Sequence, residues 1–180
     1  MRYAQIRELD ISNGEGVGVA LFVQGCRFAC KNCFNPDTWD FNGGKEWTQE
    51  VEDKLIELAN RPYIKRLSIL GGEPLADENL DGVLHLVNRF RLSFPNKTIW
   101  LYSGYQWKNI MKYEYGAKYI NNFNIDALRQ CIVSKCDVLV DGRYIDSQRD
   151  ITLKWRGSKN QRVIDIQQSI QKGEVILYCE

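Results

Sequence analysis

Buried-strand patterns alternate with helical patterns along most of this chain. The apolar run at residues 17–23 is typical of a buried strand, whereas Val51, Leu55 and Leu58 recur at the spacing of one helix face. Turn-forming residues separate such segments, as at Pro95. We predict strands at residues 17–23, 64–70, 97–102, 136–140 and 174–178, and helices at residues 48–60, about 78–91, 107–112 and 125–131, with Asp77 as the N-cap of the second helix.

The alternation of strands and helices indicates repeated βαβ units in an α/β fold. Such units give a largely parallel sheet, which is either an open doubly wound sheet or part of a barrel. Four or five units in 180 residues are too few for an eight-unit barrel, which takes about 250 residues. We therefore expect residues 1–180 to form one domain whose incomplete sheet leaves one side of its rim open.

Composition and charge narrow the class of protein. The 24 Lys and Arg residues nearly balance the 23 Asp and Glu residues, and no long basic block is present, so we expect no nucleic-acid partner. No apolar run approaches the roughly 20 residues of a membrane-spanning helix, and the first residues lack the apolar stretch of a signal peptide. A cytoplasmic protein without a membrane partner is the expectation.

Three cysteines with the spacing C-x3-C-x2-C carry the clearest chemical signal in the chain. They are Cys26, Cys30 and Cys33. Iron-sulfur clusters are usually held by four cysteines, so a group of three with no fourth nearby leaves one iron of a cluster open for a substrate.

Three other interpretations of these cysteines fit the sequence less well. A structural zinc site needs four ligands, and a ferredoxin-like carrier needs a fourth cysteine near the group, often followed by proline. A disulfide framework does not suit a chain that is long enough to bury its own core. The remaining candidate ligands are scattered along the sequence: His85, Cys131, Cys136 and Cys179.

A glycine-rich or polar loop follows each of the first four predicted strands. The carboxyl ends of parallel strands meet at one rim, so these loops are expected to surround one site. By itself Gly71-Gly72-Glu73-Pro74 is a common strand-ending turn. Beside a cluster, its glycines would let a ligand approach the backbone, and Glu73 would accept hydrogen bonds from an ammonium group. The four loops begin at Cys26, Gly71, Ser103 and Asp141.

The cysteine group followed by Gly-Gly-Glu resembles the radical S-adenosylmethionine superfamily. Longer segments resemble, in the same order along the chain, the activating proteins of anaerobic ribonucleoside-triphosphate reductase. The Trp-Arg-Gly-Ser-Lys-Asn-Gln stretch makes the resemblance to this narrower family specific. It implies an incomplete parallel (β/α) barrel of the radical SAM type. The segments are residues 13–16, 21–26, 33–39, 139–142 and 155–161.

The resemblance also implies cofactors and partners. A [4Fe-4S] cluster on Cys26, Cys30 and Cys33 would bind S-adenosylmethionine at its open iron and generate a glycyl radical on the partner reductase, with an electron donor such as flavodoxin or ferredoxin. Many superfamily members have an aromatic residue where this chain has Asn32, which leaves Phe34 or Phe28 as the ring contact with adenine. The implied cofactor-binding residues are Asn32, Cys33, Phe34, Gly71, Gly72, Glu73 and Ser103.

Two alternative functions stay open at this point. One is an activase of another glycyl-radical enzyme, such as pyruvate formate-lyase. The other is a noncatalytic iron-sulfur or zinc protein, which would not cleave S-adenosylmethionine. The stretch at residues 155–161 favours the reductase activase.

Overall fold

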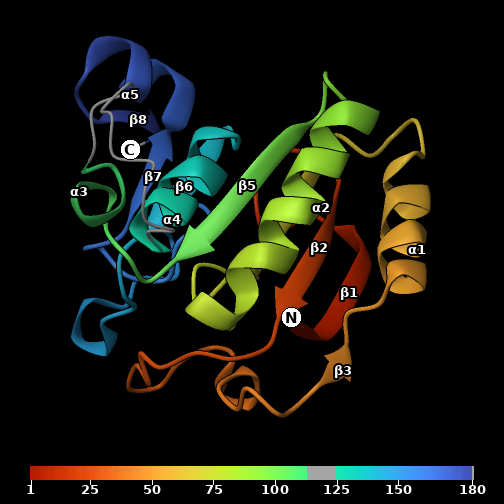
Figure 1. Cartoon of the computed structure of the whole chain (residues 1–180). Helices are drawn as coiled ribbons and strands as arrows, with labels where there is room; N and C mark the ends of the chain where they lie inside the picture. The colour runs from red at the N-terminus through yellow and green to blue at the C-terminus, as the bar shows by residue number, and fades with distance from the viewer. Residues whose placement is uncertain (113–124, 180) are drawn as a thin grey trace.

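Four buried parallel strands form the centre of the sheet, as the apolar runs predict (Figure 1). The computed structural model describes residues 1–112 and 125–179. Every residue of the first and last of these strands is buried, which explains why they read as continuous apolar runs. The four strands are β2 (Gly18–Val23), β4 (Arg66–Gly71), β5 (Thr98–Ser103) and β6 (Val138–Asp141).

Antiparallel strands flank this centre on both sides, so the sheet is mixed rather than largely parallel. On one side lie β1 (Arg2–Asp10) and β3 (Lys45–Glu46), and on the other lie β7 (Arg162–Asp165) and β8 (Ile176–Cys179). The strand order is β3-β1-β2-β4-β5-β6-β7-β8, which leaves β3 and β8 as the two edges of an open sheet in the described part of the chain. The sequence predicted β8 near its observed position but missed the other three strands.

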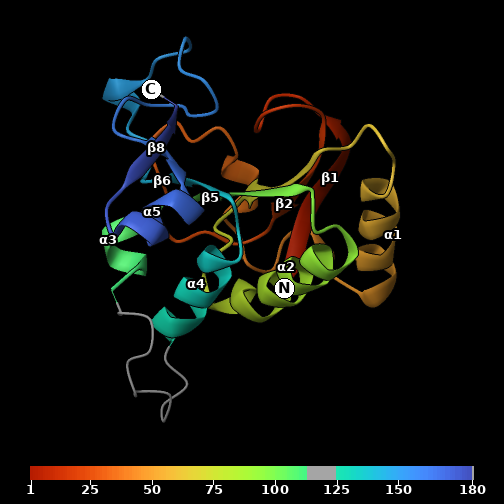
Figure 2. The same cartoon turned by 90° about the horizontal axis from the view of Figure 1, so that it is seen from above.

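Three helices cover one face of the sheet, as seen from above in Figure 2. They are α1 (Gln49–Ala59), α2 (Leu80–Ser93) and α4 (Ile125–Ser134). Their apolar faces pack on strand residues such as Leu21 and Ile69 in the main core. Within residues 1–112 and 125–179 no helix is long and apolar enough to cross a bilayer.

The predicted start of α1 is correct, whereas the predicted start of α2 is wrong. Thr48 caps α1, because its hydroxyl accepts a hydrogen bond from the backbone N–H of Val51 at 3.4 Å. The predicted N-cap Asp77 instead lies in a 3-10 turn, Asp77–Asn79, and α2 begins after Asn79. The Asp77 carboxylate forms an ion pair with Arg129 on α4, so it links the turn before α2 to α4 rather than capping α2.

Two short helices and two short turns complete the described structure. The helix α3 (Trp107–Ile110) follows β5, and α5 (Ile166–Lys172) connects β7 to β8. The 3-10 turn Pro36–Thr38 follows the cysteine group, and the turn Asp146–Gln148 follows β6.

The opposite face of the sheet is covered by loops instead of helices. Adjacent strand residues point to opposite faces, so Phe22, Leu70 and Tyr102 lie on this second face beside core residues that pack under the helices. Nearer the amino end of β5 on the same face, the Trp100 ring packs edge-on against Trp155 from the loop after β6, with ring centroids 4.9 Å apart. The loops on this face leave a cavity between them at the carboxyl ends of the parallel strands.

A fully buried ion pair lies beneath that cavity. Arg66 at the start of β4 donates to the Asp10 carboxylate at 2.7 Å, and the two side chains are 0% and 2% exposed. Gly14 and Gly18 make room for it, since a Cβ at Gly18 would lie 2.5 Å from Arg66 Cγ. The glycine-rich turn at residues 13–16 therefore wraps a buried arginine.

Replacing Asp10 by Asn is expected to lower the free energy of unfolding by about 3–5 kcal/mol, because it leaves the Arg66 charge buried without a counter-ion. Guanidinium unfolding of the metal-free protein measures this loss. Glu8→Gln is the matched control, because the Arg61–Glu8 pair is exposed and worth about 1 kcal/mol or less. Equal midpoints for the two variants would contradict the prediction.

Candidate functional site

A cavity of about 500 Å³ opens at the carboxyl ends of the four parallel strands. The loops after β2, β4, β5 and β6 all contribute to its walls, as their positions in the sequence predicted. A volume of this size suits one small-molecule ligand. The predicted site residues among its lining are Cys26, Cys30, Cys33, Phe34, Gly71, Gly72, Glu73 and Ser103.

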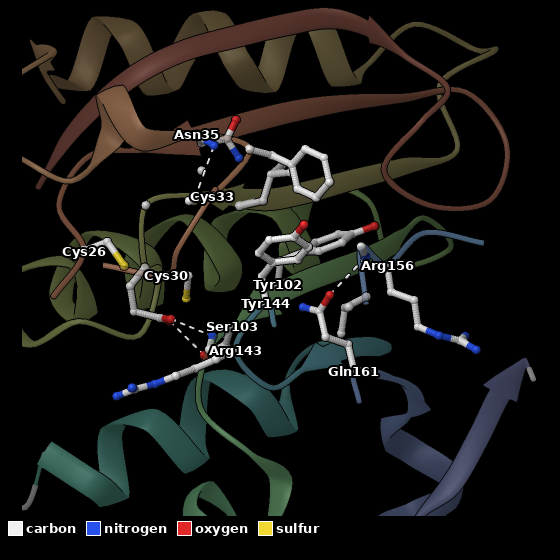
Figure 3. A pocket seen from close by; sticks show the side chains of 18 of the residues that line it. Cys26, Cys30, Cys33, Asn35, Tyr102, Ser103, Arg143, Tyr144, Arg156 and Gln161 are labelled. Carbon is white, nitrogen blue, oxygen red and sulfur yellow. Dashed lines mark hydrogen bonds between the residues drawn. The ribbon is translucent and has the colours of Figure 1, made fainter. Parts of the chain in front are cut away.

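The three cysteines lie together at one end of this cavity (Figure 3). All three are half-buried free thiols. Burial raises the pKa of Cys26 to about 11 and also raises the pKa of Cys30, which the nearby Arg143 charge opposes. A thiol must lose its proton to bind metal, so cluster binding at this end of the cavity releases protons.

Backbone hydrogen bonds fix the start of the cysteine loop. The N–H of Gly25 donates to the carbonyl of Thr38 at 2.8 Å, and the N–H of Glu73 donates to the carbonyl of Gly25 at 2.8 Å. Gly25 has a φ of +98°, and a Cβ there would lie 2.2 Å from the Phe41 ring. These contacts hold the cysteine loop against the Gly-Gly-Glu loop.

The donor set fits an iron-sulfur cubane. In residues 1–112 and 125–179 no three His, Cys, Asp or Glu side chains lie close enough to hold a single metal ion. Three cysteines that bind three different irons of a cubane do not need to meet at one point. Their thiols, placed at the end of a cavity with free space beside them, leave room for a ligand on the fourth iron.

Glu73 lies at the junction of two of the cavity loops. Its carboxylate accepts hydrogen bonds from the Ser103 hydroxyl and the Gly104 N–H, both at 2.8 Å, and from the Leu75 N–H at 2.9 Å. Burial raises its pKa to about 7, while these bonds and the Arg129 charge act in the opposite direction. Glu73 therefore ties the loop after β4 to the loop after β5, a role that the sequence did not reveal.

Aromatic side chains pack around the cysteine loop. Phe28 lies on Gly104, where a Cβ would be 2.4 Å from its ring, and the Arg143 guanidinium lies 4.3 Å from the centre of the same ring. Phe34 packs edge-on against Tyr144, with centroids 5.1 Å apart, although its side chain remains largely exposed. Both candidates for the adenine contact therefore line the cavity, and the contact itself stays a prediction.

Asn32 does not line the cavity. It is exposed, has a φ of +55°, and donates to the Asp146 carboxylate at 2.8 Å. Its side chain thus joins the cysteine loop to the turn after β6. A direct cofactor contact of Asn32 stays a prediction.

The stretch at residues 155–161 forms a wall of the cavity, which the sequence alone did not show. Gln161 accepts from the Gly157 N–H at 2.9 Å and donates to the Gly142 carbonyl at 2.9 Å. The buried Ser158 hydroxyl accepts from the Ile145 N–H at 3.2 Å. A Cβ at Gly157 would lie 2.6 Å from the Phe34 ring, so this glycine lets the wall contact the cysteine loop.

Comparison with known proteins agrees with this site. Residues 12–164 match the family model of the 4Fe-4S single cluster domain, and the chain belongs to that family. Among characterised relatives it is 40% identical to the anaerobic ribonucleoside-triphosphate reductase-activating protein of Vibrio cholerae serotype O1 over 163 residues, which are 89% of this chain and 96% of that protein.

Other relatives carry the same description. The Escherichia coli K12 protein is 37% identical over 165 residues, which are 91% of this chain and 97% of that protein. The protein of Enterobacteria phage T4 is 34% identical over 165 residues, covering 91% of this chain and 93% of that protein. The chain is therefore a member of the anaerobic ribonucleoside-triphosphate reductase-activating protein family.

Proposed function

We infer that this protein generates a glycyl radical on an anaerobic ribonucleoside-triphosphate reductase, using a [4Fe-4S] cluster and S-adenosylmethionine. The observation that carries the inference is the meeting of the three-cysteine loop and the Gly-Gly-Glu loop at one cavity, in a chain of this family. Held by Cys26, Cys30 and Cys33, a reduced cluster would supply the electron for reductive cleavage of S-adenosylmethionine, and that cleavage would provide the oxidant for removal of a hydrogen atom from the glycine Cα.

The residues of the chain bind and orient the cofactors. Cys26, Cys30 and Cys33 would hold three irons at their end of the cavity. Glu73 would accept a hydrogen bond from the methionine ammonium, and the two loops that it joins would hold the cofactor in one orientation. The aromatic contacts of Phe28 with Tyr105 and of Phe34 with Tyr144 would hold the cysteine loop in place beside the cluster.

The open sheet supports a macromolecular substrate. We propose that it corresponds to an incomplete (β/α) barrel, in which β3 and β8 are unpaired edges. A barrel that is open at the side gives a loop of the reductase a path to the cavity. An electron donor such as flavodoxin or ferredoxin would reach the cluster from the exposed side of the cysteine loop, where Ala29, Lys31 and Asn32 face solvent.

The test is radical formation on the partner. The cluster-loaded protein, reduced and mixed with S-adenosylmethionine and its cognate reductase, is expected to give a glycine-centred doublet in electron paramagnetic resonance. Replacing the target glycine of the reductase by Ala should remove the signal. Pyruvate formate-lyase, offered in parallel, should give none.

Two outcomes would contradict the proposed function. A doublet on pyruvate formate-lyase, with none on the reductase, would assign the chain to the other activase. Absence of S-adenosylmethionine cleavage by a fully loaded and reduced cluster would instead support a noncatalytic cluster protein.

A further inference from the structure

Arg129 on α4 contacts two of the cavity loops from the face of the sheet that the helices cover (Figure 2). Its Nε donates to the Leu75 carbonyl at 2.9 Å, in the loop after β4. Its guanidinium carbon lies 4.7 Å from the centre of the Tyr105 ring in the loop after β5, and its Nη2 donates to the Tyr105 hydroxyl at 3.3 Å. Arg129 is not among the described residues that line the cavity, so a direct contact with a ligand there does not account for it.

Two carboxylates fix the orientation of the Arg129 guanidinium. Nη1 donates at 2.8 Å to Asp126, one turn earlier on α4, and Nη2 forms an ion pair with Asp77 in the turn before α2. The Arg129 side chain is only 12% exposed, so little water competes for its donors. A planar guanidinium presents five N–H donors in fixed directions, whereas the compact ammonium of lysine is a point charge without this fork.

Glu73 holds the same two loops from inside the cavity. Its carboxylate accepts from the Leu75 N–H at 2.9 Å and from the Ser103 hydroxyl at 2.8 Å, and the Ser103 oxygen accepts from the Tyr105 N–H at 3.1 Å. Leu75 therefore donates to Glu73 through its N–H and accepts from Arg129 through its carbonyl. Burial raises the pKa of Glu73, and the Arg129 charge opposes that rise.

Tyr105 extends these contacts to two further loops of the cavity. Its ring packs edge-on against Phe28 of the cysteine loop, with centroids 5.0 Å apart. Its carbonyl accepts from the Gly142 N–H at 3.1 Å, in the loop after β6. A shift of Tyr105 would therefore disturb the loops after β2, β5 and β6 together.

The attachment of α4 to the sheet does not depend on Arg129 alone. Ile132 and Val133 on the same helix are fully buried in the main core. The two carboxylates that Arg129 contacts are partly exposed, so water would solvate them if Arg129 were replaced. Loss of the Arg129 side chain is therefore expected to loosen the loops that it contacts while α4 stays in place.

We propose that Arg129 is a positioning residue, which holds the Glu73 carboxylate in its binding geometry by fixing Leu75 and Tyr105 from outside the cavity. This assignment rests on the proposed function, in which Glu73 would bind the methionine ammonium of S-adenosylmethionine, and adds the support behind that carboxylate. Groups that are already ordered bind a ligand at a lower entropic cost. Loss of Arg129 should therefore weaken cofactor binding through Glu73.

Amide hydrogen exchange in the metal-free protein tests whether Arg129 fixes the loops. Arg129→Met should raise the exchange rates of the Leu75 and Gly104 N–H groups about tenfold or more, because both donate to Glu73 and would lose their fixed geometry. The N–H groups of β2 should exchange at wild-type rates, which shows that the fold is intact. Arg89→Met is the matched control, because Arg89 also pairs with two carboxylates, but these lie on α1.

A double-mutant cycle on S-adenosylmethionine affinity, measured in the cluster-loaded protein, tests whether Arg129 acts through Glu73. Arg129→Met alone should weaken binding about fivefold or more, whereas in the Glu73→Gln background it should change the affinity by less than about twofold. The carboxylate that Arg129 positions is already absent in that background. A general structural role would instead weaken binding by the same factor in both backgrounds. Arg129→Lys should behave like Arg129→Met, because lysine keeps the charge but loses the planar fork.

Three results would overturn the proposal. They are wild-type exchange rates of the Leu75 and Gly104 N–H groups in Arg129→Met, an equal loss of affinity in both backgrounds of the cycle, and wild-type affinity in Arg129→Lys. If the loaded wild type does not bind S-adenosylmethionine, the proposed function fails, while exchange in the metal-free protein still decides whether Arg129 fixes the two loops.

Discussion

Replacing Cys26, Cys30 or Cys33 by Ala is expected to abolish iron-sulfur loading. Anaerobic reconstitution of the wild type should load about four irons and four sulfides per chain, as a cubane requires. Each single variant leaves two thiols at the end of the cavity, which cannot hold the cubane. Iron and sulfide analysis together with the visible absorption spectrum measures the loss.

The other cysteines provide the controls for this experiment. Cys131 is exposed on α4, and Cys136 is buried in the main core away from the cavity. Cys131→Ala, Cys136→Ala and Cys179→Ala should therefore load as the wild type does. Stoichiometric zinc without sulfide, or loss of the cluster in one of these three variants, would rule out the three-cysteine model.

Glu73→Gln is expected to weaken S-adenosylmethionine binding by about tenfold or more while the cluster still loads. A charge-assisted hydrogen bond from the methionine ammonium to Glu73 would be worth roughly 1.5–3 kcal/mol. In addition, the amide nitrogen of Gln cannot accept a hydrogen bond, so one of the N–H or O–H groups of Leu75, Ser103 and Gly104 loses its acceptor. Equilibrium titration of the loaded protein measures the change.

The pH dependence of binding gives a second measurement of the same residue. The pKa of Glu73 is raised to about 7, so its ionised fraction grows between pH 6 and pH 8. S-adenosylmethionine affinity in the wild type should therefore rise with pH over this range, and the rise should be absent in Glu73→Gln. His85→Ala is the control, because His85 is 62% exposed and pairs with Glu52 on the helical face. Unchanged affinity in Glu73→Gln would remove the residue from the site.

The parts of the fold that the sequence predicted well are those with strong local patterns. The four parallel strands are mostly apolar and largely buried, and α1 has both a clear apolar stripe and a capping threonine. By contrast, β1 leaves most of its side chains partly or fully exposed, and β3 and β7 have two and four residues. Short or half-exposed strands have weak patterns, because their pairing depends on neighbours that are distant in the sequence.

The stretch at residues 155–161 shows a different limit. The residue pattern of this stretch supported the family assignment, yet the pattern alone assigned no physical role to any of its residues. The role came from contacts across the fold, such as Gly157 against Phe34 and Gln161 against Gly142. Asn32 is the opposite case, since it lies inside the cysteine group but is hydrogen-bonded to Asp146 outside the cavity.

The sequence by itself determined the cluster chemistry and the rim on which it lies. Cysteine spacing is a local property, and the carboxyl ends of parallel strands meet at one edge whatever the rest of the chain does. Only the tertiary structure decided that Glu73 joins two loops, that antiparallel strands flank the parallel centre of the sheet, and that the Tyr102 hydroxyl and the Arg156 Nε are buried beside the cavity without a hydrogen-bond partner. These features depend on which distant segments meet and on how deeply they are buried, and local residue patterns do not encode either.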